Sequence, residues 1–170
     1  MKYGIYVFPL STFLSPSQNA NDLNQKWLTE LKSSPVVKSC NTLHKTTHAN
    51  PIHEPELTQL LSSIDTVATK LLKLPPRNHS LHAQFGISYE SDSKDHNQKL
   101  ELHMDDSTYT INICLENTAI SNELVFSVGK KYETPVHIAS GFVCVHKGTI
   151  PHYVNPIRQG TRTNIVIWMK

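Results

Sequence analysis

The sequence has little excess charge, no long apolar run and no closely paired cysteines. Its 16 Lys+Arg and 14 Asp+Glu leave a net charge of +2, far from the concentrated basic face typical of nucleic-acid-binding domains. Its apolar runs are much shorter than the ~20 residues of a membrane-spanning helix. The cysteines, Cys40, Cys114 and Cys144, form no CxxC motif, which argues against a zinc ribbon or a thioredoxin-like site. We therefore expect a domain that binds neither nucleic acid nor membrane.

The first residues also lack the features of a secretory signal. Pro9, Ser11 and Thr12 interrupt the apolar stretch, and no cleavage site of small residues follows. Widely spaced thiols fit a reducing compartment better than an oxidising one. The sequence therefore predicts a cytoplasmic protein whose residues 3–8 form a first β-strand.

Two helices are expected in the first half of the chain. Apolar residues recur at helical spacing between Leu23 and Leu31, with Asn21 as the expected N-cap, and again between Leu57 and Leu72. The polar stretch 39–53 is interpreted as a loop. The 170 residues suit one domain, with a first strand and supporting helices in residues 1–76.

The pattern changes after residue 80. From Ala83 onward, about eight short segments rich in Val, Ile, Tyr and Thr are separated by turn residues. Such spacing is typical of a β-sandwich or barrel. The predicted fold is mostly β with N-terminal helices: a double-stranded β-helix (jelly roll) in residues 80–170, with two helices packed on one sheet.

A histidine and a carboxylate are separated by one residue in this β-rich part. Because residues i and i+2 of a strand point to the same side, His103 and Asp105 can face one point, while Asp106 faces away. His152 begins another predicted strand, 49 residues after His103. Two histidines and one carboxylate form the facial triad of non-haem iron(II) oxygenases. Arg162 follows, and its guanidinium could grip a carboxylate through two hydrogen bonds.

These segments resemble the iron(II)/2-oxoglutarate-dependent oxygenases, in particular the prolyl-hydroxylase-like branch. The matching stretches read LHMDDSTYTINICL, NELVF and GFVCVHKGTIPHYVNPIRQGTRTNIVIWM. The resemblance implies that His103, Asp105 and His152 bind the metal, and that no other catalytic residue is needed. It further implies that Arg162 pairs with the far carboxylate of 2-oxoglutarate and that Tyr89 lies beside this co-substrate.

The walls of the pocket are also predicted. The resemblance assigns four residues to the pocket wall: Leu124, Val154, Val166 and Trp168. Strand alternation adds three residues on one face of their strand: Thr110, Asn112 and Cys114.

The activity implied by this resemblance is hydroxylation with Fe(II), 2-oxoglutarate and O₂, and with ascorbate as an optional reductant. The first hypothesis for the substrate is a peptide or protein residue, with proline as one option. Two alternatives stay open: a hydroxylase of a free amino acid or small metabolite, and a catalytically silent jelly-roll module that binds a partner.

Several of these residues also have plainer structural interpretations. Arg162 would then belong to a surface ion pair, and Tyr89 and Trp168 would fill the core. His146, six residues before His152, is interpreted as a packed, hydrogen-bonded histidine and not as a ligand.

Overall fold

The computed structural model of the chain describes most of its length. The described residues are 3–40, 45–49, 52, 54–75, 79–91, 100–120, 123–129 and 132–170. Their helical elements are the 3₁₀ helix η1 (Leu10–Phe13), α1 (Ala20–Ser33) and α2 (Glu54–Leu71). Their strands are β1 (Ile5–Pro9), β2 (Val36–Cys40), β3 (Lys45–His48), β4 (Leu81–Glu90), β5 (Leu100–His103), β6 (Tyr109–Asn117), β7 (Leu124–Val128), β8 (Tyr132–Val136), β9 (Phe142–Lys147), β10 (His152–Val154) and β11 (Thr161–Met169). None of the helices in this described part is long and apolar enough to cross a membrane.

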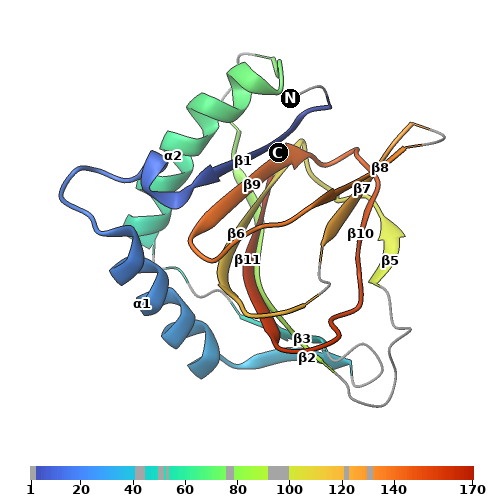
Figure 1. Cartoon of the computed structure of the whole chain (residues 1–170). Coiled ribbons are helices and arrows are strands. Elements are labelled where there is room, and N and C mark those ends of the chain that lie inside the picture. The colour runs from blue at the N-terminus through green and yellow to red at the C-terminus, as the bar shows by residue number, and fades with distance from the viewer. Residues whose placement is uncertain are drawn as a thin grey trace.

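The strands form two sheets that face each other. The large sheet has the order β1-β9-β6-β11-β4-β3-β2, and the small sheet has the order β5-β10-β7-β8. The strand pairs are antiparallel, and β6, β11 and β4 form the long central part of the large sheet. Both helices lie against the outer face of the large sheet, on the side away from the small sheet (Figure 1). This is the predicted double-stranded β-helix with two helices on one sheet.

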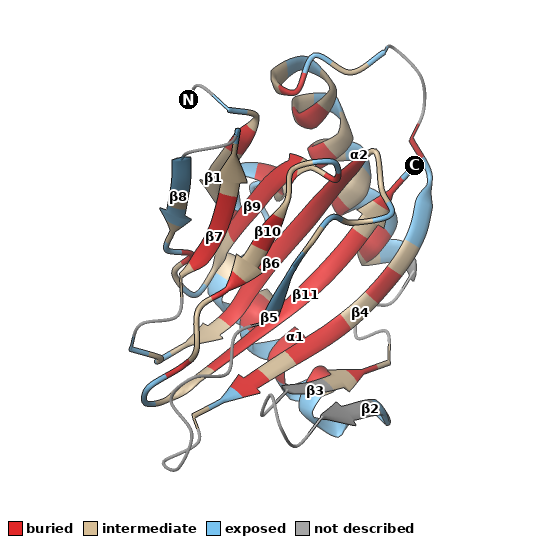
Figure 2. Cartoon of the chain, turned by 90° about the vertical axis from the view of Figure 1, so that its right-hand side faces the viewer, coloured by how far each residue is buried: buried red, intermediate tan, exposed pale blue. Residues whose placement is uncertain are grey.

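The helices and the large sheet bury a continuous apolar layer. Trp27 and Leu31 of α1 and Ile64 of α2 are fully buried, as are Ile113 of β6 and Ile165 of β11. The buried residues run as a band along the central strands (Figure 2). Alternate residues of the same strands face the small sheet, so the large sheet separates this core from a second interior space.

The N-terminus of α1 differs from the prediction by two residues. The helix is capped by Asn19, whose side chain accepts a hydrogen bond from the backbone N–H of Asn21 at 2.9 Å. Asn21 was therefore the wrong N-cap. Both asparagines suit a cap chemically, and the apolar spacing alone does not distinguish them.

The interpretation of residues 39–53 as a loop was also wrong in part. β2 and β3 form a hairpin whose second strand pairs with β4, from Lys45 opposite Tyr89 to His48 opposite Gly86. These strands extend the large sheet beyond β4, with β2 at its edge. β3 reads KTTH and is held by backbone pairing with β2 and β4, so no apolar alternation reveals it. Residues 41–44, 50, 51 and 53 lie outside the described residues.

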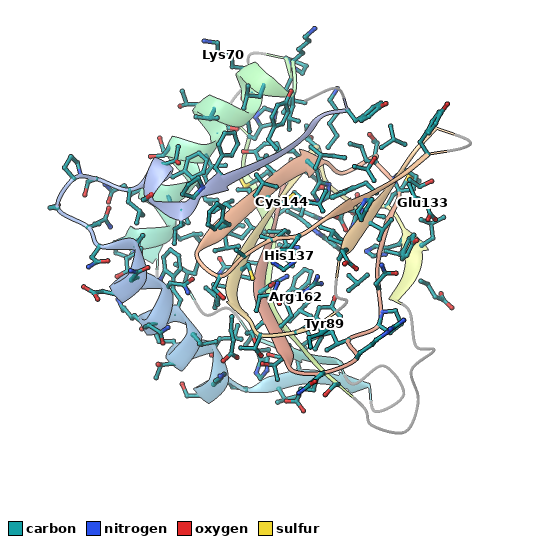
Figure 3. The ribbon with its side chains drawn as sticks, in the orientation of Figure 1. Lys70, Tyr89, Glu133, His137, Cys144 and Arg162 are labelled. Atoms are coloured by element: carbon teal, nitrogen blue, oxygen red, sulfur yellow. The ribbon has the colours of Figure 1, made fainter. Side chains whose placement is uncertain are left out.

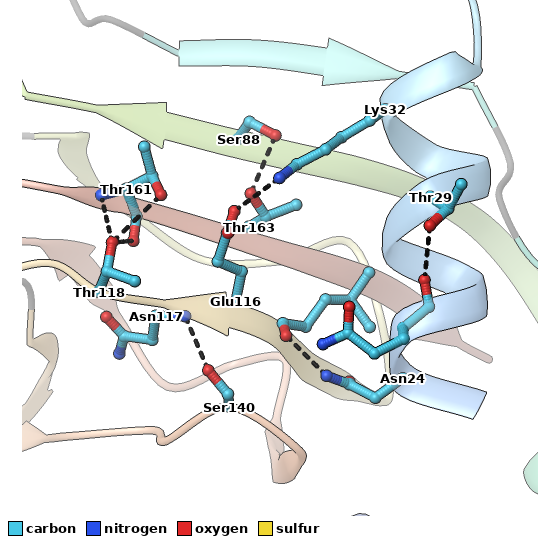
Figure 4. Close-up of polar contacts among 12 residues, drawn as sticks. Asn24, Thr29, Lys32, Ser88, Glu116, Asn117, Thr118, Ser140, Thr161 and Thr163 are labelled. Atoms are coloured by element: carbon cyan, nitrogen blue, oxygen red, sulfur yellow. Dashed lines mark hydrogen bonds and ion pairs between the residues drawn. The ribbon is translucent and has the colours of Figure 1, made fainter. Parts of the chain in front are cut away.

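Polar contacts connect α1 to the end of β6 (Figure 4). The side-chain amide of Asn24 donates to the backbone carbonyl of Leu115 at 2.7 Å, and Lys32 Nζ lies 3.0 Å from Glu116 Oε2. The ion pair is exposed, so it contributes at most about 1 kcal/mol. The buried hydrogen bond of Asn24 fixes the position of α1 along the strand more strongly.

Gly86 provides the close approach of α1 to β4. A Cβ at this position would lie 1.8 Å from Leu31 Cδ1 and 2.8 Å from Leu31 Cγ. Leu31 is fully buried and has no free space to occupy. We expect Gly86→Ala to lower the free energy of unfolding by about 1–3 kcal/mol, measured by urea denaturation. In a Leu31→Ala background this extra cost should disappear, and an equal cost in both backgrounds would contradict the argument.

The thiols of Cys114 and Cys144 should be unreactive in the folded protein. Both residues are fully buried, and burial raises the pKa of each thiol to about 12. At pH 8 only about one thiol in 10,000 would be the reactive thiolate. In Cys40→Ser we therefore expect very slow reaction with a thiol reagent in buffer and reaction of both thiols in denaturant. Fast labelling of the folded variant would contradict this prediction.

Candidate metal centre

His103, Asp105 and His152 meet where two strands of the small sheet pair. His152 of β10 lies directly opposite His103 of β5 in the antiparallel register, and their ring centroids are 4.4 Å apart. The backbone N–H of Asp105 donates to the carbonyl of Gly148 at 3.0 Å, which fixes the chain just after β5. The ligand atoms of these three side chains lie within 4.8 Å of one another.

Hydrogen bonds orient both imidazoles toward the carboxylate. His103 Nδ1 lies 2.8 Å from the carbonyl of Glu101, and His152 Nδ1 lies 3.0 Å from the carbonyl of Ile150. A carbonyl only accepts, so each Nδ1 carries the hydrogen and each Nε2 has a free lone pair. Those Nε2 atoms lie 3.8 Å from Asp105 Oδ1 and 3.7 Å from Asp105 Oδ2, respectively.

The donor set fits an iron(II) ion. Asp105 is nearly buried, with 5% of its side chain exposed, and Thr110 Oγ1 donates to its Oδ2 at 2.6 Å. Ligand imidazoles in proteins commonly donate their second N–H to a carbonyl, and ligand carboxylates are commonly hydrogen-bonded. Two such histidines and one such carboxylate suit a non-haem iron site with open positions.

Burial keeps the neighbouring imidazoles neutral. Burial lowers the pKa of His152, although the carbonyl of Ile150 and the carboxylate of Asp105 oppose this shift. Burial also lowers the pKa of His146 to about 4, with a further contribution from His152. Neutral imidazole is the form that binds metals.

Arg162 and Tyr89 form a second cluster, in the space between the two sheets. They lie opposite each other in the pairing of β11 with β4, and both point into the space between the sheets (Figure 3). Arg162 is 2% exposed, and its guanidinium carbon lies 4.9 Å from the centroid of the Tyr89 ring. Burial raises the pKa of Tyr89, so its hydroxyl keeps its proton. Both residues are buried. Arg162 therefore does not belong to a surface ion pair, which was its plainer interpretation.

One cavity of about 390 Å³ contains both clusters. Six of the seven residues predicted for its walls line it: Thr110, Asn112, Leu124, Val154, Val166 and Trp168. Cys114 lies on the same strand face, but it is not among the lining residues, and its Sγ lies 3.6 Å from the carbonyl of Glu116.

The sequence interpretation missed other residues of the cavity wall, among them Phe85, Ile87, His146 and Asn164. Strand alternation from Arg162 and Tyr89 could have identified Asn164, Ile87 and Phe85. His146 shares a strand face with Cys144, but nothing in the sequence shows that this face borders the cavity.

No protein-family model matches the chain. A 2-oxoglutarate and iron-dependent oxygenase domain-containing protein, CP2 of Arabidopsis thaliana, is 30% identical over an alignment of 101 residues that covers 52% of this chain and 25% of that protein. The chain thus spans about a quarter of the length of this curated relative.

Solved structures with a similar fold cover nearly the whole chain. A 2OG-Fe(II) oxygenase family oxidoreductase from Burkholderia pseudomallei matches 98% of this chain and 84% of its own, with a TM-score of 0.74 and 14% identity. A Trichoplax adhaerens prolyl hydroxylase in complex with a hypoxia inducible factor peptide fragment matches 99% and 84%, with a TM-score of 0.63 and 13% identity. HygX of Streptomyces hygroscopicus, with nickel, 2-oxoglutarate and hygromycin B bound, matches 98% and 82%, with a TM-score of 0.70 and 12% identity. The chain therefore has the double-stranded β-helix fold of these 2-oxoglutarate oxygenases and resembles one of their curated relatives in sequence.

Proposed function

We propose that the protein is an Fe(II)- and 2-oxoglutarate-dependent dioxygenase that hydroxylates its substrate. The observation that carries this proposal is the pairing, in one cavity, of a two-histidine, one-carboxylate cluster with a buried guanidinium. His103, Asp105 and His152 would hold the iron, and Arg162 would bind the far carboxylate of 2-oxoglutarate. The Arabidopsis relative and the fold neighbours support an iron- and 2-oxoglutarate-dependent oxygenase activity.

With both groups bound, iron supplies the oxidation: one O₂ converts 2-oxoglutarate to succinate and CO₂ and places one oxygen atom on the substrate as a hydroxyl group. The protein's own residues bind and orient the reactants. Nδ1–H donation to backbone carbonyls aims the imidazoles, and Thr110 holds one oxygen of Asp105. The guanidinium carbon of Arg162 lies over the ring of Tyr89, which restricts where a carboxylate can pair with the guanidinium.

For the substrate we propose a peptide or protein residue, with proline as one option. Within the described residues, β5 is an edge strand of the small sheet, beside the candidate metal site. Leu102 and Met104, on either side of His103, are 60% and 62% exposed. An edge strand with exposed apolar side chains suits an extended peptide, which pairs with the strand backbone. The fold neighbour with a bound peptide is consistent with this choice.

A free amino acid or small metabolite is the second candidate. The neighbour that holds hygromycin B shows that a similar fold accepts a small molecule. The cavity, at about 390 Å³, is within the size range of small-molecule pockets.

The test is turnover of 2-oxoglutarate with Fe(II) and ascorbate, measured as succinate release. We expect succinate to increase with a pool of proline-containing peptides and the product peptide to gain one oxygen atom. Stimulation only by small metabolites would favour the second candidate. No succinate with either pool, from protein that binds both iron and 2-oxoglutarate, would favour a catalytically silent binding module.

A further inference from the structure

His146 reaches the candidate metal ligands from the opposite sheet. It belongs to β9 of the large sheet, whereas His103 and His152 belong to the small sheet. Its side chain is 1% exposed, and its Nε2 lies 3.9 Å from Asp105 Oδ2. Its ring centroid is 4.9 Å from that of His152 and 4.8 Å from that of Phe126. His146 is therefore part of the cavity wall and lies directly beside the three candidate metal ligands.

The hydrogen bond of His146 makes its inward-facing nitrogen an acceptor. Its Nδ1 lies 3.0 Å from the carbonyl of Lys147, so the hydrogen is on Nδ1 and the lone pair is on Nε2. His103 and His152 have the same arrangement. Three imidazole lone pairs thus face one carboxylate, and buried acceptors need a donor or a cation between them.

The position of His146 differs from that of the two candidate ligands. Among the described residues, the group of mutually close ligand atoms contains His103, Asp105 and His152 and does not include His146. Across the β6–β9 pair, His146 lies opposite Thr110, whose hydroxyl donates to Asp105 Oδ2. The same carboxylate oxygen therefore has one neighbour that donates, Thr110, and two whose nearest nitrogens can only accept, His146 and the candidate ligand His152.

We propose that His146 is a positioning residue of the metal centre, whose Nε2 accepts a hydrogen bond from a water molecule bound to the metal beside Asp105. This inference rests on the proposed function, because it requires a metal ion at the three candidate ligands. It assigns to His146 a role distinct from both a metal ligand and a core residue. Such a hydrogen-bond partner would hold the water at an open coordination position. Loss of a hydrogen-bond partner of a metal ligand typically weakens metal binding about 10- to 100-fold.

The test compares His146→Phe with His146→Gln. Phenylalanine keeps a flat ring beside Phe126 but accepts no hydrogen bond, whereas glutamine offers a side-chain oxygen. For His146→Phe we expect an unchanged or higher melting temperature of the metal-free protein and an affinity for Mn(II) about 10-fold lower, measured by calorimetry. His146→Gln should recover part of the affinity. A purely structural role predicts instead that His146→Phe binds Mn(II) as tightly as the wild type, because an apolar ring would fill the same buried site.

Electron paramagnetic resonance of the Cu(II)-loaded protein provides a second measurement. We expect two coordinated imidazoles in the wild type and the same number in His146→Phe. A third imidazole in the wild type would overturn the proposal, because His146 would then be a ligand. Unchanged Mn(II) affinity in folded His146→Phe would also overturn it. If that variant does not fold, His146→Leu against His146→Gln makes the same comparison.

These measurements separate this inference from the proposed function. A wild-type protein that binds no metal would refute both. Wild-type binding that depends on Asp105 but is unchanged in the variants of His146 would refute only the role of His146.

Discussion

In Asp105→Asn, the affinity for metal should fall by more than about 100-fold, because the only anionic member of the candidate ligand set is lost. Loss of a residue that only hydrogen-bonds to a ligand already lowers metal affinity by about 10- to 100-fold. Metal at 100 times its Kd should stabilise the wild type by about 2.7 kcal/mol. For a protein of this size, that stabilisation raises the melting temperature by about 5–10 °C. We expect no such shift for the variant at the same concentration of Mn(II), measured by differential scanning fluorimetry.

Asp106→Asn is the matched control. Asp106 is the next residue, but its side chain is 73% exposed and pairs with Lys170 at 2.8 Å. Loss of an exposed ion pair has little effect, so this variant should keep both the wild-type affinity and the thermal shift. His152→Ala should behave like Asp105→Asn. The ligand assignment would be wrong if Asp105→Asn retained the metal or if both aspartate variants lost it equally.

In Arg162→Gln, the affinity for 2-oxoglutarate should fall by about 150- to 5,000-fold. The guanidinium is buried in the cavity wall, and a carboxylate left without its buried partner typically costs 3–5 kcal/mol. Calorimetry of 2-oxoglutarate binding to the Ni(II)-loaded protein measures this change without turnover. Metal affinity in the absence of 2-oxoglutarate should stay the same, since Arg162 is not among the candidate ligands.

Two controls test whether this effect belongs to the buried guanidinium. Arg158→Gln removes an arginine that is exposed and should leave 2-oxoglutarate binding unchanged. Tyr89→Phe keeps the ring that faces Arg162 and should weaken binding by less than about 10-fold, the typical value of one neutral hydrogen bond. Wild-type affinity in folded Arg162→Gln would place the far carboxylate elsewhere.

Local pattern predicted much of the fold. The apolar spacing of Trp27 and Leu31 predicted α1, and the alternation through Ile87 and Tyr89 predicted β4, because each element buries one face. The polar hairpin β2–β3 and the cap at Asn19 were missed. The polar strand β3 is held by backbone pairing with β2 and β4 and shows no apolar alternation, and Asn19 and Asn21 suit a cap equally well.

The candidate site was predictable where the chain itself brings residues together. His103 and Asp105 share a side of the chain because they are two residues apart. His152 and Arg162 were identified by residue type and position in the predicted strands, and the resemblance to known oxygenases assigned their roles. The cavity wall was predicted only in part: Cys114 was included although it is not a lining residue, and Asn164 was omitted.

The sequence by itself determined the types of residue at the site, the alternation of the strands and the helices that cover one sheet. Only the tertiary structure decided that His152 lies opposite His103 and that His146, from the other sheet, faces Asp105 at 3.9 Å. The reason is physical: alternation shows which residues share a face of one strand. Which faces meet across the space between two sheets depends on strand register and on the packing of the layers, which involve residues far apart in the chain.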